Sequence, residues 1–280
     1  MKKRALAAAV LTSILGVAAV AGCTSDKPAV TESTGTATDA AAIARLVVGF
    51  DQDFPPYGYV GDDGKFTGFD LDLAAEVAKR NSWEVEYKPI NWDAKDLELS
   101  SGAIDCIWNG FTIEGREDGY TWTEPYMDNS QVIVVKSDSG ITTLAGLAGK
   151  TVMTQADSAA FHLLSAEGDQ EALAKTFKAV QTTPEYNTAF LELESGAVDA
   201  VAIDLPVAKF QVQGKESAYS ILTEPLSLEH YGVGFLLGNT ALRDQVQKTL
   251  KEMVADGTVK TIAEKYADQG ISYDQWILEA

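Results

Sequence analysis

The chain contains 280 residues, 46% of them hydrophobic, and carries a formal net charge of −19 at pH 7. A surface with this excess of carboxylates repels phosphate groups, so the composition argues against nucleic acid as a partner. The length allows one large domain or two modest lobes behind a leader.

The first 22 residues have the pattern of a secretory signal peptide. Three basic residues at positions 2–4 precede an apolar run over positions 5–21, and small residues lie directly before Cys23. This arrangement resembles a bacterial lipoprotein signal, which implies that Cys23 is lipidated and tethers the chain outside the cytoplasmic membrane. The alternative is an ordinary membrane-spanning anchor. Loss of the three basic residues would leave a charge of −22.

Residues 23–44 are predicted to be the lipidated cysteine and a flexible linker. Thr, Ser, Ala, Asp and Pro dominate this stretch, and almost nothing in it can be buried. The second cysteine, Cys106, lies in an apolar strand-like run. We therefore expect Cys106 to be a buried thiol without a disulfide partner.

Strand-like and helix-like segments alternate beyond the linker, which predicts a largely parallel α/β fold. Residues 46–50 are predicted to form a buried strand, and residues 70–80 an amphipathic helix. The segment 99–107 returns in similar form at 193–201, each with a helix end, a glycine suited to the C′ position and a strand. This internal similarity predicts two similar lobes, although chance reuse of a good helix stop is the alternative.

Polar groups follow the strand of each similar segment. The first is followed by Asn109, Thr112 and Arg116, and the second by Asp204. Because ligands of open α/β sheets bind beyond the carboxyl ends of strands, these groups could face one small molecule. A guanidinium and a carboxylate together suit the zwitterion of an amino acid.

Short motifs recur in a fixed order over residues 46–266. They are VGFD (48–51) with FPPY (54–57), GK (64–65) with GFDLDL (68–73), SGAID (101–105), PY (125–126), LAGKTV (147–152), GAVDA (196–200) with Asp204, and DGT (256–258) before IAEKY (262–266). In this combination they resemble the extracellular solute-binding proteins, family 3, of bacterial polar amino acid ABC transporters.

The resemblance implies a type II periplasmic-binding-protein-like α/β fold with two lobes joined by two crossover strands. Lobe 1 would comprise residues 45–129 plus 231–280, and lobe 2 residues 130–230. It implies no cofactor, no metal and no catalytic residue, and a monomer that binds a polar L-amino acid and the permease subunits of the transporter.

The resemblance also implies a set of ligand-binding residues. Aromatic side chains would cover the apolar part of the ligand, and Asp51 would lie near its side chain. Arg116, with Gly110 and Thr112, would hold the α-carboxylate, and Asp204 the α-ammonium. The full set is Asp51, Phe54, Trp92, Asn109, Gly110, Thr112, Arg116, Gln155, Ser158 and Asp204.

Two positions depart from the family pattern. Thr112 and Arg116 are four residues apart where the family usually has five, so the loop is shortened by one residue. Asp157-Ser158-Ala159 replaces a Gly-Ser/Thr-Ser/Thr turn. We expect Asp157 to be solvated, with contact to a cationic substrate as the alternative.

Several other polar residues have structural interpretations. Asp70 is expected to cap a helix, and Asp105 and Asp199 to be structural because they recur at matching places. His162 and His230 are expected to be isolated and not to bind metal. Phe54 could instead cap a sheet edge, and Trp92 could belong to the core.

A binding protein is the favoured function, because no nucleophile elbow, phosphate loop or Cys–His pair occurs. A cyclohexadienyl (prephenate or arogenate) dehydratase on the same scaffold is the enzyme alternative, with Glu114 or Asp157 as its acid or base. A sensory ligand-binding domain is disfavoured, since no second apolar segment or signalling module follows. Asp51 and Asp53 slightly favour a cationic amino acid, while glutamine or cystine fit nearly as well.

Overall fold

A computed structural model describes residues 43–280 of the chain. These residues fall within a single structural unit of the chain. The predicted signal peptide, Cys23 and nearly all of the predicted linker lie outside the described residues.

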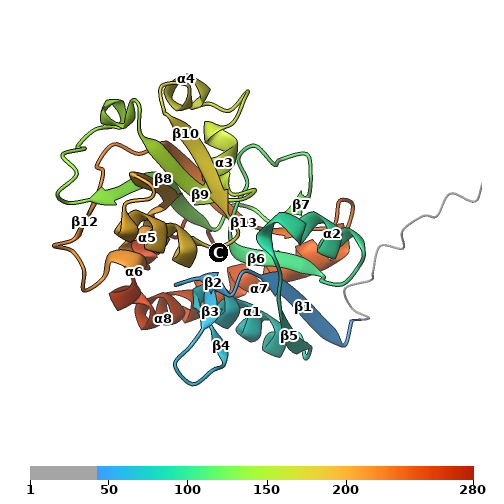
Figure 1. Cartoon of the computed structure of the whole chain (residues 1–280). Coiled ribbons are helices and arrows are strands. Elements are labelled where there is room, and N and C mark those ends of the chain that lie inside the picture. The colour runs from blue at the N-terminus through green and yellow to red at the C-terminus, as the bar shows by residue number, and fades with distance from the viewer. Residues whose placement is uncertain (1–42) are drawn as a thin grey trace, which may run out of the picture. The chain divides into compact units, whose positions relative to one another are not determined.

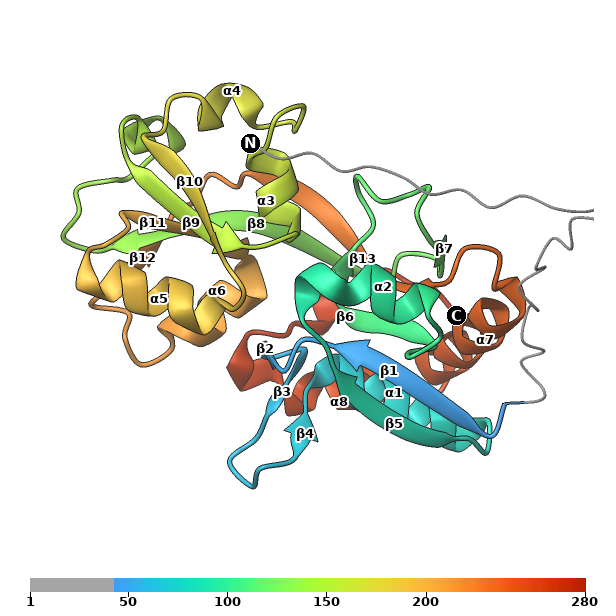
Figure 2. The ribbon, with the colours of Figure 1, turned by 45° about the vertical axis from the view of Figure 1, so that its right-hand side comes forward.

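The described residues form two α/β lobes joined by two crossover strands, as predicted (Figures 1 and 2). The first lobe contains β1 (Arg45–Phe50), β2 (Asp53–Phe54), β3 (Gly58–Val60), β4 (Phe66–Thr67), α1 (Phe69–Arg80), β5 (Glu84–Pro89), η2 (Trp92–Ala94), α2 (Lys95–Ser100), β6 (Cys106–Thr112), β7 (Thr121–Trp122), α7 (Thr240–Ala255) and α8 (Thr258–Lys265). The second lobe contains β9 (Thr151–Gln155), α3 (Ala159–Leu164), α4 (Glu171–Ala174), β10 (Ala179–Thr183), α5 (Tyr186–Ser195), β11 (Ala200–Asp204), α6 (Leu205–Val212) and β12 (Tyr219–Ile221). The crossover strands are β8 (Met127–Lys136) and β13 (Ser227–Phe235).

The main sheet runs through both lobes in the order β10-β9-β11-β8-β13-β6-β1-β5. Within the first lobe β5, β1 and β6 are parallel, and within the second β10, β9 and β11 are parallel. The crossover strands are the exception to the largely parallel sheet, because β8 and β13 pair antiparallel with each other and with the neighbouring strands of each lobe. The boundaries that we propose for the lobes, at 129/130 and 230/231, fall inside β8 and β13.

Apolar side chains on strand β1 and helix α1 build the core of the first lobe. The predicted strand 46–50 and helix 70–80 are confirmed as β1 and α1. Leu46 and Val48 of β1 and Leu73 and Val77 of α1 belong to one buried cluster and are fully shielded from solvent. Burial of each such side chain contributes roughly 1.5–3 kcal/mol to folding. The sheet is thereby held rigidly enough to position its strand ends.

The two similar segments fold in the same way. Helices α2 and α5 are followed by Gly102 and Gly196, whose φ angles are 73° and 80°, and then by β6 and β11. The Asp105 carboxylate accepts from Val47 N at 2.7 Å, and Asp105 N donates to Val47 O at 2.8 Å. Asp199 makes the same pair of contacts with Thr151, at 2.8 and 2.9 Å. The structural roles predicted for both aspartates are confirmed.

Two further expectations concern the described residues. Cys106 is fully buried, as predicted, and within residues 43–280 its thiol forms no disulfide. Within residues 43–280 no helix has both the length and the apolar composition that a membrane crossing requires.

Candidate functional site

A small cavity lies between the lobes, at the carboxyl ends of β6, β9 and β11. Nine of the ten residues predicted to bind ligand line it, and Ala159 is an additional lining residue. Asp51, the tenth, is not part of the lining, but its carboxylate contacts Gln155 Nε2. The lining residues are Phe54, Trp92, Asn109, Gly110, Thr112, Arg116, Gln155, Ser158, Ala159 and Asp204.

Asp204 supplies a buried carboxylate at the end of β11. Its Oδ1 accepts hydrogen bonds from Asn129 Nδ2 at 2.8 Å, Gln131 Nε2 at 2.7 Å and Tyr231 OH at 2.5 Å. Burial raises the pKa of Asp204, although the three donors favour the ionised form. A cationic group in the cavity would therefore meet an oriented carboxylate.

Glu229 of β13 is a second buried carboxylate that the sequence reasoning missed. Its Oε1 accepts from Thr112 Oγ1 at 2.9 Å, Asn129 Nδ2 at 2.6 Å and Gln131 Nε2 at 2.8 Å. Burial raises the pKa of Glu229 to about 8, and the charge of Asp204 adds to this effect. The signal for Glu229 was its period-two spacing from Tyr231, which puts both side chains on one face of the strand.

Arg116 reaches the cavity although its loop is one residue short. After β6 a turn closes with Arg116 N donating to Ile113 O at 2.9 Å, and Gly115 in this turn has a φ of 77°. The guanidinium lies 5.3 Å from the Phe111 ring centroid, and its Nη1 donates to Thr112 O at 3.3 Å. The shortened loop therefore folds back over its own strand and keeps the cation at the cavity.

Asp70 holds the floor of the cavity and does not cap a helix. The N-cap of α1 is Gly68, no side chain caps the helix, and Asp70 is fully buried within the first turn. Its Oδ2 accepts from Gly110 N at 2.5 Å and from Tyr126 OH at 2.9 Å. Burial raises the pKa of Asp70 to about 7. The cap prediction was wrong because the carboxylate bonds to another strand and not to its own helix.

Two aromatic side chains form apolar walls. Phe54 lies 5.9 Å from Tyr57 in a stacked arrangement, and Trp92 packs edge-on against Phe111 at 5.4 Å. Both Phe54 and Trp92 are buried yet line the cavity. Their packing partners fix the ring positions, so the walls do not need a ligand to be ordered.

Asp51 links the lobes next to the cavity. Its carboxylate accepts from Asp53 N at 2.8 Å and from Gln155 Nε2, which belongs to the second lobe, at 2.5 Å. Burial raises the pKa of Asp51 to about 6. Asp53 in turn accepts from Asn187 Nδ2 across the lobes at 2.9 Å. These carboxylates therefore take part in contacts between the lobes.

Asp157 is paired and not merely solvated, so that expectation was wrong. Its carboxylate forms a close ion pair with Lys95 of the first lobe, and its carbonyl accepts from Arg116 Nη2 at 2.9 Å. Burial would raise its pKa, but the His162 and Lys95 contacts lower the pKa of Asp157 to about 2. Lys95 is almost completely buried. Next to Asp157, the Ser158 hydroxyl caps α3 by accepting from Phe161 N at 3.1 Å.

The two histidines are not isolated, contrary to expectation. His162 Nε2 lies 2.7 Å from an oxygen of Asp157, and His230 Nδ1 lies 2.5 Å from an oxygen of Glu114. Within the part of the chain that the structure describes, no group of three or more His, Cys, Asp or Glu side chains is arranged to hold a metal ion.

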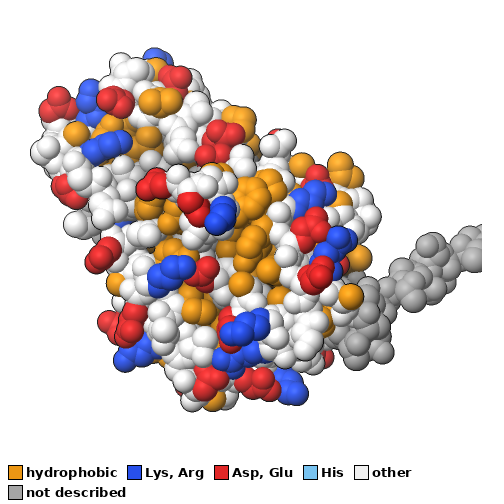
Figure 3. Space-filling view, turned by 90° about the horizontal axis from the view of Figure 1, so that it is seen from below, with side chains coloured by type: hydrophobic (Ala, Val, Ile, Leu, Met, Phe, Trp, Pro, Cys, Tyr) orange, Lys and Arg blue, Asp and Glu red, His pale blue; other side chains and the backbone are white. Residues whose placement is uncertain are grey.

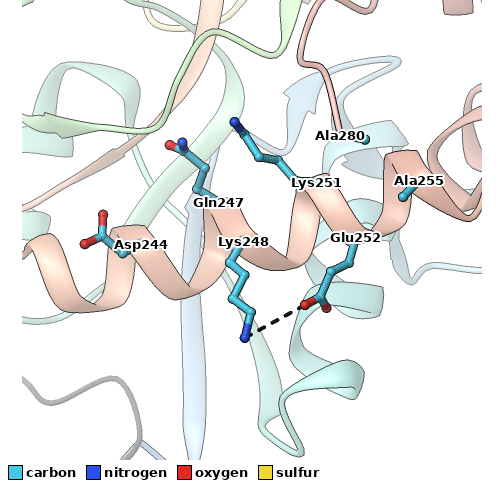
Figure 4. Close-up of a pocket in the computed structure, with 7 residues that line it drawn as sticks. All are labelled: Asp244, Gln247, Lys248, Lys251, Glu252, Ala255 and Ala280. Atoms are coloured by element: carbon cyan, nitrogen blue, oxygen red, sulfur yellow. Dashed lines mark ion pairs between the residues drawn. The ribbon is translucent and has the colours of Figure 1, made fainter.

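On other surfaces the polar side chains do not point toward one common site. A larger open groove runs along α7, but Figure 4 shows Gln247 and Lys251 pointing to one side of the helix and Lys248 to the other. Its one drawn ion pair, Lys248 with Glu252, is 3.9 Å long. On the face in Figure 3, acidic and basic side chains are interspersed around a hydrophobic patch. That face therefore offers no continuous basic surface for nucleic acid.

Comparison with known proteins assigns the family. Residues 46–269 match the model of the bacterial extracellular solute-binding proteins, family 3. The chain belongs to this family. It is 30% identical to the L-cystine-binding protein TcyJ of Escherichia coli (strain K12), over 95% of this chain and 97% of the relative.

Solved structures agree with the family assignment. A substrate-binding protein of an ABC uptake transporter from Streptococcus pneumoniae with bound histidine is 30% identical, with a TM-score of 0.75 over 82% of this chain and 95% of that one. The ancestral amino acid-binding protein AncCDT-1, a precursor of cyclohexadienyl dehydratase, is 29% identical, with a TM-score of 0.71 over 80% of this chain and 95% of that one. Type II periplasmic binding proteins thus share the fold described here.

Proposed function

We propose that this protein is the substrate-binding component of an ABC transporter and that it captures a polar L-amino acid between its lobes. The observation that carries the proposal is one small cavity with the Arg116 guanidinium and the Asp204 carboxylate in its lining. The α-carboxylate would bind Arg116, and the α-ammonium would bind Asp204. The remaining lining residues would hold the ligand's backbone and side chain.

Capture and release follow from the placement of the two charges. Arg116 follows β6 in the first lobe, and Asp204 ends β11 in the second. A ligand that bridges them favours the closed arrangement, because only that arrangement allows both contacts. The loaded protein would then dock on the permease subunits and release the amino acid for uptake.

The ligand class is a polar amino acid. Similar proteins are named for cystine and bind histidine. Beside the cavity, a hollow has Asp51, Asp53, Glu98 and Glu185 among its lining residues. These charges favour a side chain with a cationic or strongly polar end.

The dehydratase alternative has weaker support. Neither of its candidate acid–base residues, Glu114 and Asp157, lines the cavity. Glu114 pairs with His230, and Asp157 pairs with Lys95 and His162. A general acid or base has to reach the reacting atom, so these pairs leave the cavity without one at those positions. We therefore infer binding without chemistry.

The proposal also covers where the protein is located and how it assembles. Cys23 would carry the lipid that anchors the protein on the outer side of the cytoplasmic membrane, facing a periplasm or the cell surface. The protein would act as a monomer, with the permease as its protein partner.

A thermal-shift screen of the purified protein against all proteinogenic amino acids, cystine and ornithine tests the function. A ligand at 100 times its Kd stabilises a protein by about 2.7 kcal/mol, which is an easily measured shift. We expect at least one strong response, to be confirmed by calorimetry. A flat screen of folded, ligand-free protein, together with turnover of prephenate or arogenate, would replace this proposal by the enzyme alternative.

A further inference from the structure

An ion pair joins the two lobes next to the cavity. The ammonium of Lys95, at the start of α2 in the first lobe, pairs with the carboxylate of Asp157, between β9 and α3 in the second lobe. Within residues 43–280 every other ion pair lies inside one lobe or involves a crossover strand. Asp51 also reaches across the lobes, but its partner there is the neutral amide of Gln155. Among the described residues, one pair of opposite charges therefore joins the lobes directly.

Lys95 is a buried cation that needs a counter-ion. The residue is 1% exposed, and its Nζ lies 5.2 Å from the centroid of the Trp92 ring and 3.4 Å from Trp92 O. Burial lowers the pKa of Lys95, while the contact with Asp157 opposes this shift. In the described part of the chain no other carboxylate forms an ion pair with Lys95. Closing the lobes without the Asp157 carboxylate would therefore bury an ammonium with no counter-ion, which is strongly unfavourable.

Asp157 occupies a backbone position that suits glycine. Its φ is 57°, in the left-handed region that Asp and Asn tolerate better than other residues with side chains, and the family pattern has glycine here. A second partner, His162 Nε2, lies 2.7 Å from the carboxylate. Although burial opposes it, the contacts with His162 and Lys95 lower the pKa of Asp157 to about 2, so the group is ionised at neutral pH. Each ion of the pair thus has a further polar contact, the condition under which a buried ion pair is favourable.

The same residue also holds Arg116. Arg116 Nη2 donates to Asp157 O at 2.9 Å, so the backbone of the second lobe supports the guanidinium of the first. Neither Lys95 nor Asp157 lines the cavity. The ion pair can therefore form with or without a ligand, but it forms only when the lobes lie together.

We propose that Asp157 is a positioning residue whose ion pair with Lys95 is a latch, which holds the lobes together and slows release of the ligand without touching it. This inference rests on the proposed function, since it assigns how the closed arrangement is held. The lobes have to separate before the ligand leaves, so breaking the pair adds to the barrier for release. The latch also favours closure without a ligand, because both charges belong to the chain.

Two substitutions test the pair. Asp157→Asn removes the charge and keeps a side chain that tolerates the left-handed φ. Lys95→Met removes the buried ammonium and keeps an unbranched chain, and the double variant shows whether the two effects depend on each other. Asp72→Asn is the matched control, because the Asp72 carboxylate is 29% exposed, against 32% for Asp157, and pairs with Lys265 inside the first lobe.

The first measurement is the rate constant for ligand release. L-Cystine, L-histidine and L-arginine are the first ligands, followed by any other amino acid that responds in the thermal-shift screen. Stopped-flow mixing follows tryptophan fluorescence, since Trp92 lines the cavity.

We expect Asp157→Asn to raise the release rate constant roughly 10–100-fold, because the buried Lys95 loses its counter-ion in the closed arrangement. Lys95→Met should raise it less, since no buried ammonium is left unpaired. In the Lys95→Met background, Asp157→Asn should change release by less than about threefold. The control Asp72→Asn should change it by less than about twofold.

The second measurement needs no ligand. The radius of gyration of the ligand-free protein, from small-angle X-ray scattering, should be larger in Asp157→Asn than in wild type, because the lobes separate more often. Asp72→Asn should keep the wild-type value.

The outcomes separate this inference from the proposed function. If wild type binds no amino acid in the screen, the proposed function fails, and X-ray scattering still tests the latch: equal radii of gyration in wild type and Asp157→Asn overturn it. If an amino acid binds but Asp157→Asn releases it at the wild-type rate, the latch is wrong and the proposed function stands. If Asp157→Asn speeds release by the same factor with and without Lys95, Asp157 acts through its turn and not through the ion pair.

Discussion

The two lobes use one backbone design and carry opposite charges to the cavity. In each lobe a helix ends at a left-handed glycine, and an aspartate then ties the start of the next strand to a neighbouring strand. Beyond the strands they differ. β6 continues into a tight turn that returns Arg116, whereas β11 ends at Asp204 and passes directly into α6. The shared design positions the strand ends, and the residues placed there determine the chemistry.

The support beneath these strand ends also differs. In the first lobe a single buried carboxylate, Asp70, holds the Gly110 amide. In the second, Asp204 is itself the functional carboxylate and is held by Asn129, Gln131 and Tyr231 from the crossover strands. The negative end of the site therefore depends on the crossover strands, while the positive end is held by Thr112 O of the first lobe and Asp157 O of the second.

Removing the charge of the first lobe should have the largest effect. We expect Arg116→Ala to weaken amino acid binding by about 3–5 kcal/mol, because the ligand carboxylate would be buried without its partner. This corresponds to a loss of roughly 10²–10³-fold or more, measured by calorimetry. Arg80→Ala is the matched control, since Arg80 pairs with Glu76 and Asp256 away from the cavity. A loss below about fivefold would remove Arg116 from the site.

Removing the support of the first lobe should reduce stability. Asp70→Ala leaves Gly110 N and Tyr126 OH buried without an acceptor, at a cost of about 1–3 kcal/mol for each group. The free energy of unfolding from urea titration should fall accordingly, and the remaining folded protein should bind ligand less tightly. Unchanged stability would show that these donors find other partners and that Asp70 is dispensable.

The buried Glu229 of crossover strand β13 should make the free energy of unfolding depend on pH. Glu229 has its pKa raised from 4.5 to about 8, so the folded state keeps a proton that the unfolded chain has released. Its contribution to stability therefore falls as pH rises from about 4.5 to about 8 and is level above that range. Glu229→Gln cannot lose this proton, so we expect a flatter melting temperature between pH 5 and 8. If the melting temperature changes with pH equally in wild type and variant, the raised pKa of Glu229 is wrong.

The paired glycines should show the smallest effects, and similar ones in both lobes. A Cβ at Gly102 or Gly196 meets no atom within 4 Å, so alanine there is unfavourable only because of the positive φ. We expect each substitution to reduce the free energy of unfolding by about 1–2 kcal/mol. Gly68→Ala should be far worse, since its Cβ would lie 2.1 Å from Tyr57 O. Clearly unequal effects at Gly102 and Gly196 would show that the lobes are not energetically equivalent.

Much of this protein follows from local sequence. The hydrophobic periodicity identified β1 and α1, and the repeated segment indicated two lobes. The motifs indicated the family and a set of ten ligand-binding residues, nine of which line the cavity. These features can be predicted because each is a short pattern formed by residues that are neighbours in the chain. Family motifs add positions that local physics alone does not connect.

Only the tertiary structure decided the partners of the buried charges. Asp70 bonds to Gly110 from 40 positions away, Asp157 pairs with Lys95 across the lobes, and Glu229 receives the proton of Thr112. Such contacts join residues that are distant in sequence, and no local pattern says which donor a buried carboxylate will meet. The sequence by itself therefore determined the strands, the lobes and the residues at their ends, while three-dimensional packing decided which hydrogen each oxygen accepts.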